Sequence, residues 1–263
     1  MAYELTLQAE ISQLADQIFG KDRKNRANFV SWLVDTCTKA EGKDFILIHN
    51  PGGWGCTPLA DCLEWERSIV EGISASLERL GYSYLLTQYF RSGRGWKSHM
   101  RNLKDEAVFV AKGKSNRAKV MAAELNFITS HLNALKIIMV GVSQGAAFSN
   151  AVMRQLGELR QVFSIELGIF FAHVNRRVVT DRTLAIDSNG VVPDPMVHRN
   201  LWIGFKAYIT APFRWAKYRL QGRPEKFTYC INAPGHDYNW KYPKVQLQIQ
   251  EFLERNFRNK KEN

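Results

Sequence analysis

Residues 137–148 read IIMVGVSQGAAF, an apolar run followed by a glycine-flanked serine and then by small residues. This order is typical of a buried strand, a tight turn and a helix. A serine on such a turn has a strained backbone and presents its hydroxyl above the edge of the sheet. Gly141 and Gly145 flank it because a larger side chain would collide with neighbouring backbone. The stretch therefore predicts an α/β fold with Ser143 at a candidate site.

Outward from this stretch, short apolar runs alternate with helical patterns from residue 45 onward. This alternation indicates a mainly parallel sheet with helices on both faces. Residues 1–44 are predicted to form two helices, an extension packed on a domain of residues 45–263. We expect about six strands, near residues 45–49, 83–90, 136–142, 164–171, 182–187 and 226–232.

The bulk composition is that of a globular chain with 263 residues and 45% hydrophobic content. Its first ten residues carry acids instead of a basic start, and no segment has the ~18 continuous apolar residues of a membrane span. The four cysteines are few and irregularly spaced, which favours reduced thiols and matches no zinc pattern. We therefore expect a cytoplasmic protein that holds no metal.

Positive charge is concentrated in two stretches of the chain, whose formal net charge is +11. Residues 91–119 hold nine Lys or Arg against two acids, and residues 199–226 hold seven against one. Such clusters attract nucleic acid, acidic lipid headgroups or phosphorylated small molecules, and the alternative is a basic face that only aids solubility. Residues 90–98, FRSGRGWKS, are not a nucleotide-binding P-loop because Trp96 replaces the glycine before Lys-Ser.

Three residues, Ser143, Asp187 and His236, follow one another in an order that resembles the α/β-hydrolase superfamily of serine esterases and lipases. The resemblance covers most of residues 45–257 and implies a nucleophile, an acid and a histidine in that sequence. Serine needs a base to take its proton, and a third group must hold the base in one tautomer. His236 suits the base because it lies on a loop between the last expected strand and a helix over residues 243–257.

The acid of this triad has two candidates. Asp187 ends an expected strand, and the turn that follows it looks like the one after the family's acid. The family often places its acid about four residues before the proline of a Val-Pro pair, where this chain has Asn189. We favour Asp187 and keep Asp194, just after that proline, as the alternative.

Backbone donors for a developing oxyanion are implied by the same resemblance. One is the N–H of Gln144, which follows the nucleophile. The other comes from the loop HNPGGWG at residues 49–55, where Pro51 cannot donate because it has no N–H. Gly53 or Trp54 is the favoured second donor.

Residues 197–221 mix aromatic residues with lysines and arginines and form a candidate lid or cap insertion before the last strand. Such a segment suits a lid over an acyl pocket or an interfacial helix on an anionic membrane. The competing interpretation is a surface helix whose aromatic side chains pack on the domain.

Together these features predict a serine hydrolase that cleaves a carboxylic ester or thioester without a cofactor, acting on a small acyl substrate of lipid-like or anionic character. Peripheral contact with an anionic membrane is a further expectation. The alternative is a catalytically inactive member of the fold that binds a ligand or a protein. A nucleic-acid binder is not expected, since charge alone suggests it, and the sequence does not indicate an oligomeric state.

Overall fold

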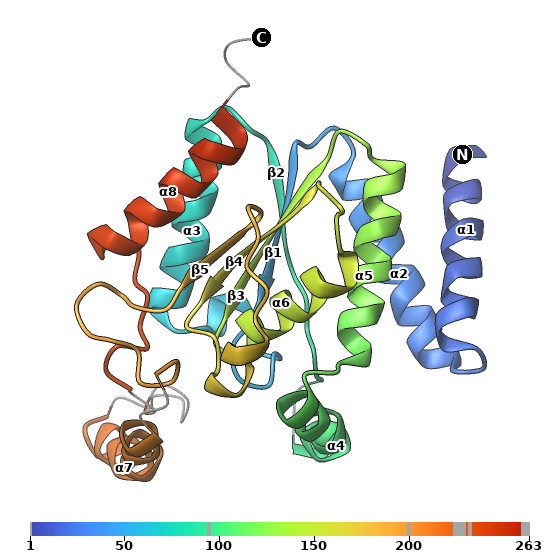
Figure 1. Cartoon of the computed structure of the whole chain (residues 1–263). Helices are drawn as coiled ribbons and strands as arrows, with labels where there is room; N and C mark the ends of the chain where they lie inside the picture. The colour runs from blue at the N-terminus through green and yellow to red at the C-terminus, as the bar shows by residue number, and fades with distance from the viewer. Residues whose placement is uncertain (1, 94–95, 199–200, 223–229, 231–232, 259–263) are drawn as a thin grey trace.

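The protein has a single parallel sheet of five strands in the order β2-β1-β3-β4-β5, with helices on both faces (Figure 1). This computed structural model describes all residues except 1, 94–95, 199–200, 223–229, 231–232 and 259–263. The strands are β1 (Phe45–Asn50), β2 (Tyr84–Gln88), β3 (Lys136–Val142), β4 (Val162–Leu167) and β5 (Thr183–Ile186). These five agree with the sequence prediction. The sixth, expected at residues 226–232, lies outside the described residues except for Cys230.

The helices fill the intervals between strands, as the apolar periodicity predicts. They are α1 (Ala2–Phe19), α2 (Arg23–Ala40), α3 (Glu64–Arg79), α4 (Trp96–Lys112), α5 (Asn116–His131), α6 (Gln144–Leu156), α7 (Leu201–Leu220) and α8 (Pro243–Phe257). Two short 3-10 helices, η1 (Leu59–Asp61) and η2 (Phe171–Arg176), complete the described elements.

The core lies on both faces of the sheet because successive side chains of a strand point in opposite directions. In β1, Ile46 and Ile48 join the cluster formed with α1, α2, α5 and α6. Phe45 and Leu47, which alternate with them, join the cluster formed with α3 and α8. A strand covered on both sides must be apolar throughout, which explains the continuous hydrophobic run that identified it.

The two N-terminal helices pack on the sheet domain. Ile11 of α1 and Leu33 of α2 are fully buried in the same cluster as strand residues of β1 and β3. Asp22 lies in the short turn between α1 and α2. Its carboxylate caps the start of α2 by accepting the backbone N–H of Asn25. α1 and α2 therefore contribute to the core on one face of the sheet.

The carboxyl ends of the strands face one end of the molecule, where α4 and α7 also lie (Figure 1). The strand order reverses between β1 and β3, because β2 lies on one side of β1 and β3 to β5 lie on the other. In open α/β sheets, the crevice at the carboxyl ends at such a switch point is where ligands bind. Among the described residues, no helix is both long and apolar enough to cross a membrane.

Candidate active site

Ser143 lies on a strained turn between β3 and α6, directly at the switch point. Its φ of 53° makes it the single non-glycine residue with positive φ in the described part of the chain. Its N–H donates to the carbonyl of Leu167, the last residue of β4, at 2.9 Å. A side chain in this backbone region costs energy and is retained where the surrounding structure enforces it, often at functional sites.

The glycines on either side of Ser143 are enforced by backbone packing. A Cβ on Gly145 would lie 2.1 Å from the carbonyl oxygen of Asn50, and one on Gly141 would lie 2.6 Å from the carbonyl oxygen of Gly145. The turn brings α6 directly against the end of β1, which leaves no room for a methyl group. This steric reason is the one that the sequence motif indicated.

His236 and Asp194 form a hydrogen-bonded pair. His236 Nδ1 lies 2.7 Å from Asp194 Oδ2, and Asp194 is fully buried. A carboxylate accepts hydrogen bonds, so Nδ1 carries the proton and Nε2 is left as the basic nitrogen. Asp194 also accepts the Tyr238 hydroxyl and, through Oδ1, the N–H of Met196 at 2.8 Å. These three donors fix the carboxylate and, through it, the imidazole.

Close backbone packing holds this pair beside the serine turn. Gly168 follows β4 immediately after Leu167, the residue that accepts the Ser143 N–H. A Cβ on Gly168 would lie 2.5 Å from Asp194 Oδ2, so Gly168 leaves the space that the acid occupies. A Cβ on Gly235 would lie 2.5 Å from the carbonyl oxygen of Pro193, so the histidine loop docks on the acid loop. The Ser143, Asp194 and His236 segments thus share one sheet edge.

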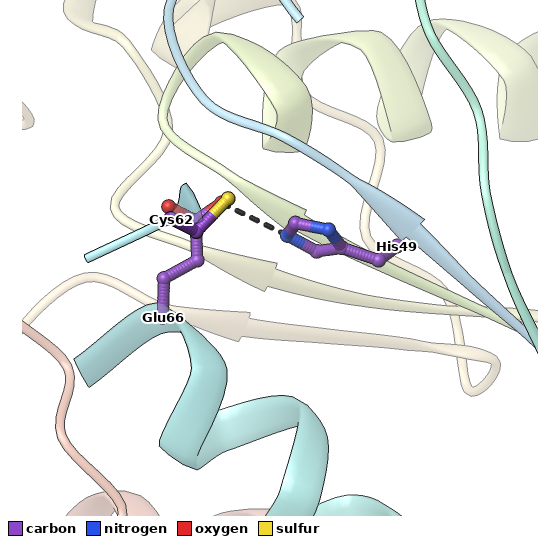
Figure 2. Close-up of side chains that lie close together, drawn as sticks. All are labelled: His49, Cys62 and Glu66. Carbon is purple, nitrogen blue, oxygen red and sulfur yellow. Dashed lines mark hydrogen bonds and ion pairs between the residues drawn. The ribbon is translucent and has the colours of Figure 1, made fainter. Parts of the chain in front are cut away.

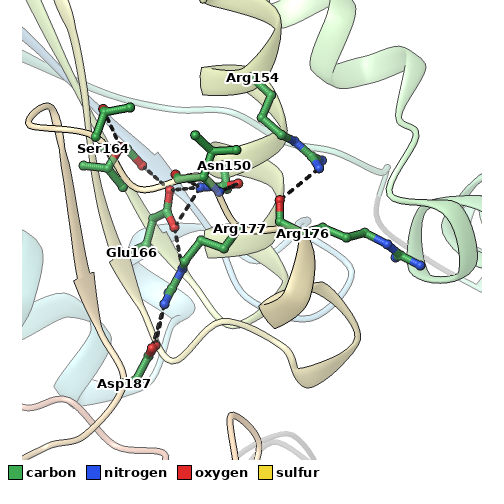
Figure 3. Close-up of polar contacts among 10 residues, drawn as sticks. Asn150, Arg154, Ser164, Glu166, Arg176, Arg177 and Asp187 are labelled. Atoms are coloured by element: carbon green, nitrogen blue, oxygen red, sulfur yellow. Dashed lines mark hydrogen bonds and ion pairs between the residues drawn. The ribbon is translucent and has the colours of Figure 1, made fainter.

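The expectation that Asp187 orients the histidine is wrong in this structure. Both carboxylate oxygens of Asp187 accept from Arg177 Nη1, at 2.9 and 2.7 Å, and Figure 3 shows the pair. Arg177 follows η2, and Asp187 follows β5. Asp187 is therefore paired with a cation. The carboxylate that contacts His236 is Asp194, the alternative that follows Pro193.

Arg177 links Asp187 to a buried carboxylate on β4. Its Nε donates to Glu166 Oε2 at 3.0 Å, and Asn150 and Ser164 also donate to Glu166 (Figure 3). Burial raises the pKa of Glu166 to about 7, outweighing the opposite effect of the Arg177 guanidinium. These contacts give Asp187 and Glu166 a structural role away from the serine.

The loop after β1 contacts the serine turn and is held by buried Arg91. A Cβ on Gly52 would lie 3.9 Å from the Ser143 Cβ. Arg91 Nη2 donates to the carbonyls of Pro51 and Gly53, at 2.9 and 2.7 Å, and the Ser92 hydroxyl donates to the Trp54 carbonyl. The carbonyls of this loop are thus engaged by Arg91 and Ser92, whereas the Gly53 N–H has no hydrogen bond among the described residues.

The other predicted oxyanion donors are placed as follows. Gln144 is the first residue of α6, so its N–H has no acceptor within the helix and lies next to Ser143. Its side-chain amide donates to Glu106 Oε2 at 3.4 Å. Trp54 is exposed and follows Gly53 in the same loop. Gln144 and Gly53 are therefore two predicted donors whose N–H groups have no hydrogen bond among the described residues.

A second buried pair, His49 and Glu66, supports this loop from the opposite side. Gln88 Oε1 accepts the N–H of Leu59, so its NH₂ group donates to His49 Nδ1 at 3.0 Å. The proton of His49 is then on Nε2, which donates to Glu66 Oε1 at 2.8 Å. The same oxygen accepts the N–H of Gly52 at 3.4 Å, which takes Gly52 out of the set of oxyanion donors.

His49, Glu66 and Cys62 also form a cluster whose donor atoms all lie within 4.8 Å of one another (Figure 2). A metal would need a thiolate and an unprotonated imidazole nitrogen. Burial raises the pKa of the Cys62 thiol well above its ordinary range, and the Gln88 contact places the His49 proton on the nitrogen that faces Glu66. The residues therefore fit a hydrogen-bonded structural cluster that supports the loop better than they fit a metal centre.

Comparisons with known proteins add no family. Neither the scan against protein-family models nor the search of curated proteins finds a match to this chain. Any function assigned to this chain therefore depends on the arrangement of the candidate site residues.

Sequence reasoning missed several residues that shape the site. The sequence places Arg91 in a basic stretch and does not single out Tyr238, Glu66 or Trp65. The Trp65 ring packs edge-on to His236, with ring centroids 6.5 Å apart. A sequence signal exists only for Arg91, which follows a strand within the loop at the carboxyl edge.

Proposed function

We propose that the protein is a serine hydrolase of the α/β-hydrolase superfamily that cleaves a carboxylic ester or thioester. The observation that carries the proposal is the 2.7 Å contact between buried Asp194 and His236 Nδ1, at the sheet edge where Ser143 occupies a strained turn. Asp194 keeps the imidazole in the tautomer whose Nε2 can take a proton. This gives each of the three residues one role in acyl transfer.

In the first half of the reaction, the Ser143 hydroxyl oxygen attacks the carbonyl carbon while its proton passes to His236 Nε2. The carbonyl π electrons move to oxygen, and the resulting oxyanion accepts the N–H groups of Gln144 and Gly53. When the carbonyl re-forms, the bond to the alcohol or thiol breaks. The leaving group takes the proton from His236, and the acyl group stays on Ser143.

In the second half, water replaces the leaving group. His236 Nε2 takes a proton from water, whose oxygen attacks the acyl carbon. Collapse of this second intermediate releases the carboxylic acid and returns the proton to the Ser143 oxygen. In the described structure Ser143 and His236 are not hydrogen-bonded to one another, and such contacts often tighten only with substrate bound.

The test is covalent labelling followed by turnover. A fluorophosphonate probe should label the purified protein on Ser143 and should not label Ser143→Ala. A series of p-nitrophenyl esters of graded acyl length should be hydrolysed by the wild type and not by this variant. Ser149→Ala is a matched control, because Ser149 is a buried serine on α6 that takes no part in the proposed reaction and accepts a hydrogen bond from Asn50.

Equal hydrolysis of every ester by wild type and Ser143→Ala would refute the proposal. Absence of both labelling and turnover, with the protein folded, would instead favour the alternative of a ligand- or protein-binding member of the fold.

A further inference from the structure

The solvent-facing side of α7 carries a stripe of large apolar side chains. Trp202, Ile209, Phe213 and Leu220 are exposed by 70%, 50%, 74% and 89%. Their spacing of seven, four and seven residues places them within about 40° of one line at about 100° per residue. The stripe is about 27 Å long at about 1.5 Å per residue. We call these four residues the α7 stripe.

The opposite side of α7 is the one that is buried. Ala207 and Ala211 are buried there, and Trp215 and Tyr218 are half-buried. A helix that only covers a core turns its large apolar residues inward and its polar residues outward. The four residues of the α7 stripe point outward instead, and the described part of the chain does not bury them.

Cations border the stripe, and α7 contains no acidic residue. Lys206 and Lys217 are exposed, four residues after Trp202 and Phe213, so they lie beside the stripe. Arg219 is also exposed and stacks on the Trp215 ring at 4.2 Å. Lysine stems can lie along an apolar surface while their ammonium groups reach an anionic layer.

We propose that α7 is a docking surface for an anionic lipid bilayer, with the helix lying in the plane of the headgroups. Helices that bind in this way place aromatic and aliphatic residues into the boundary of the acyl chains and keep Lys and Arg among the headgroups. The helix lies at the carboxyl end of the strands, the same end as the Ser143 turn (Figure 1). Docking through α7 therefore brings the candidate active site to the membrane surface.

Charge decides between this occupant and the others. A second copy that paired α7 with α7 would bring Lys206, Lys217 and Arg219 of both chains together with no acid on either helix. A nucleic acid would use the cations and leave the apolar stripe in water. An anionic bilayer satisfies both, because its headgroups neutralise the cations and its acyl region takes up the stripe.

The substrate class follows from this placement. An active site held at the headgroup layer meets acyl esters that partition into the bilayer, such as those of phospholipids or acylglycerols. Membrane docking stands on α7 alone, whereas this substrate class rests on the proposed hydrolase function.

The experiment is vesicle co-sedimentation with the full chain carrying Ser143→Ala, so that lipids are not consumed. Vesicles of phosphatidylcholine alone are compared with vesicles that contain phosphatidylglycerol, each at low and high salt. The Ser143→Ala protein should bind the anionic vesicles, bind them more weakly at high salt, and bind the neutral ones far less.

Two α7 variants and their controls separate the apolar and charged contributions. Adding Phe213→Ser should lower the partition coefficient about tenfold, since it removes one large apolar side chain from the boundary. Adding Lys217→Glu should lower it at least about fivefold. Leu247→Ser, an exposed apolar position on α8, and Lys43→Glu, at the amino end of β1, are the matched controls and should change it less than twofold. Circular dichroism checks that every variant is folded.

Equal binding to both kinds of vesicle, or no binding, would overturn the docking proposal. So would a concentration-dependent dimer that Phe213→Ser abolishes in the absence of vesicle binding, because it would assign the stripe to a second copy.

A parallel assay on the Ser143-containing protein separates this proposal from the hydrolase proposal. The Phe213→Ser protein should hydrolyse a water-soluble short-chain ester at the wild-type rate and an ester embedded in anionic vesicles about tenfold more slowly. A wild-type protein that hydrolyses the soluble ester but does not bind anionic vesicles contradicts docking alone. Vesicle binding without turnover of any ester contradicts the hydrolase alone.

Discussion

Replacing Asp194 by asparagine should remove most of the hydrolytic rate while leaving the fold in place. Asparagine has nearly the same shape, but its amide group presents two donors where the carboxylate presents acceptors. The carboxylate of Asp194 accepts three hydrogen bonds, from His236 Nδ1, the Tyr238 hydroxyl and the Met196 N–H. In either orientation of the amide, its NH₂ group faces at least one of these donors.

The magnitude follows from the tautomer of His236. If the NH₂ group takes the position of Oδ2, it donates to Nδ1 and moves the imidazole proton to Nε2, the nitrogen that must accept the Ser143 proton. This change of tautomer costs about four orders of magnitude in kcat in triad enzymes. At about 1.4 kcal/mol per tenfold, the barrier to acylation rises by about 5 kcal/mol.

The assay compares Asp194→Asn with Asp187→Asn on a short-chain p-nitrophenyl ester. The Asp187 side chain is 35% exposed and pairs with Arg177, which is 7% exposed and also contacts Glu166. Asparagine keeps an oxygen that can accept from Arg177, so Asp187→Asn should keep kcat within about threefold of the wild type. Thermal unfolding of both variants shows whether any loss of rate comes from loss of fold.

The reasoning is refuted if Asp187→Asn loses more rate than Asp194→Asn while both remain folded. Equal losses would also refute it, because the two carboxylates have different partners in the structure and should not be interchangeable.

Three further predictions concern the turn, the loop and the buried acid. Gly145→Ala should lower the free energy of unfolding by about 3 kcal/mol, since its Cβ would lie 2.1 Å from the Asn50 carbonyl oxygen. Urea denaturation measures this, and Gly42→Ala, where a Cβ meets open space, should lose only about 1 kcal/mol from its positive φ. Arg91→Lys should lower kcat at least about tenfold with KM nearly constant, because the lysine chain ends one bond short of Nη2, the nitrogen that donates to both the Pro51 and Gly53 carbonyls; a kcat no lower than that of Arg79→Lys, at an exposed arginine on α3, would contradict the role of the loop. Burial raises the pKa of Glu166 from 4.5 to about 7, so the folded state binds more protons in this window and wild-type stability should fall as pH rises through it. Relative to Glu166→Gln, the wild type should lose on the order of 3 kcal/mol between pH 4.5 and 7, and a constant difference in urea titrations across this window would show that Glu166 does not ionise there.

The candidate site shows where reasoning from the sequence stopped. The Ser143 turn was predictable, because Gly141 and Gly145 are needed for a steric reason confined to a few consecutive residues and the strand beside them. His236 was predictable from its place on a loop between the last expected strand and the final helix. The carboxylate that contacts His236 was not, because Asp187 is paired with Arg177, a residue from a different connection that no local pattern places beside Asp187.

The contacts that Arg91 makes with the loop after β1 could not be predicted from the sequence either, because they also join distant segments of the chain. Arg91 lies 38 residues after Gly53 along the chain, and their contact exists because β1 and β2 are neighbours in the sheet. Periodicity can assign Arg91 to a loop at the carboxyl edge. It cannot say that the guanidinium turns inward and is fully buried.

The sequence by itself determined the α/β class, the five described strands and the residues of the serine turn, because these follow from periodicity and local sterics. It also determined that residues 197–221 combine aromatic and basic side chains. Only the tertiary structure decided that Asp194 meets His236, that Arg91 holds the Gly53 carbonyl, and that the large side chains of α7 face outward. These depend on which side chains from distant segments occupy the same space, and local patterns carry no information about that.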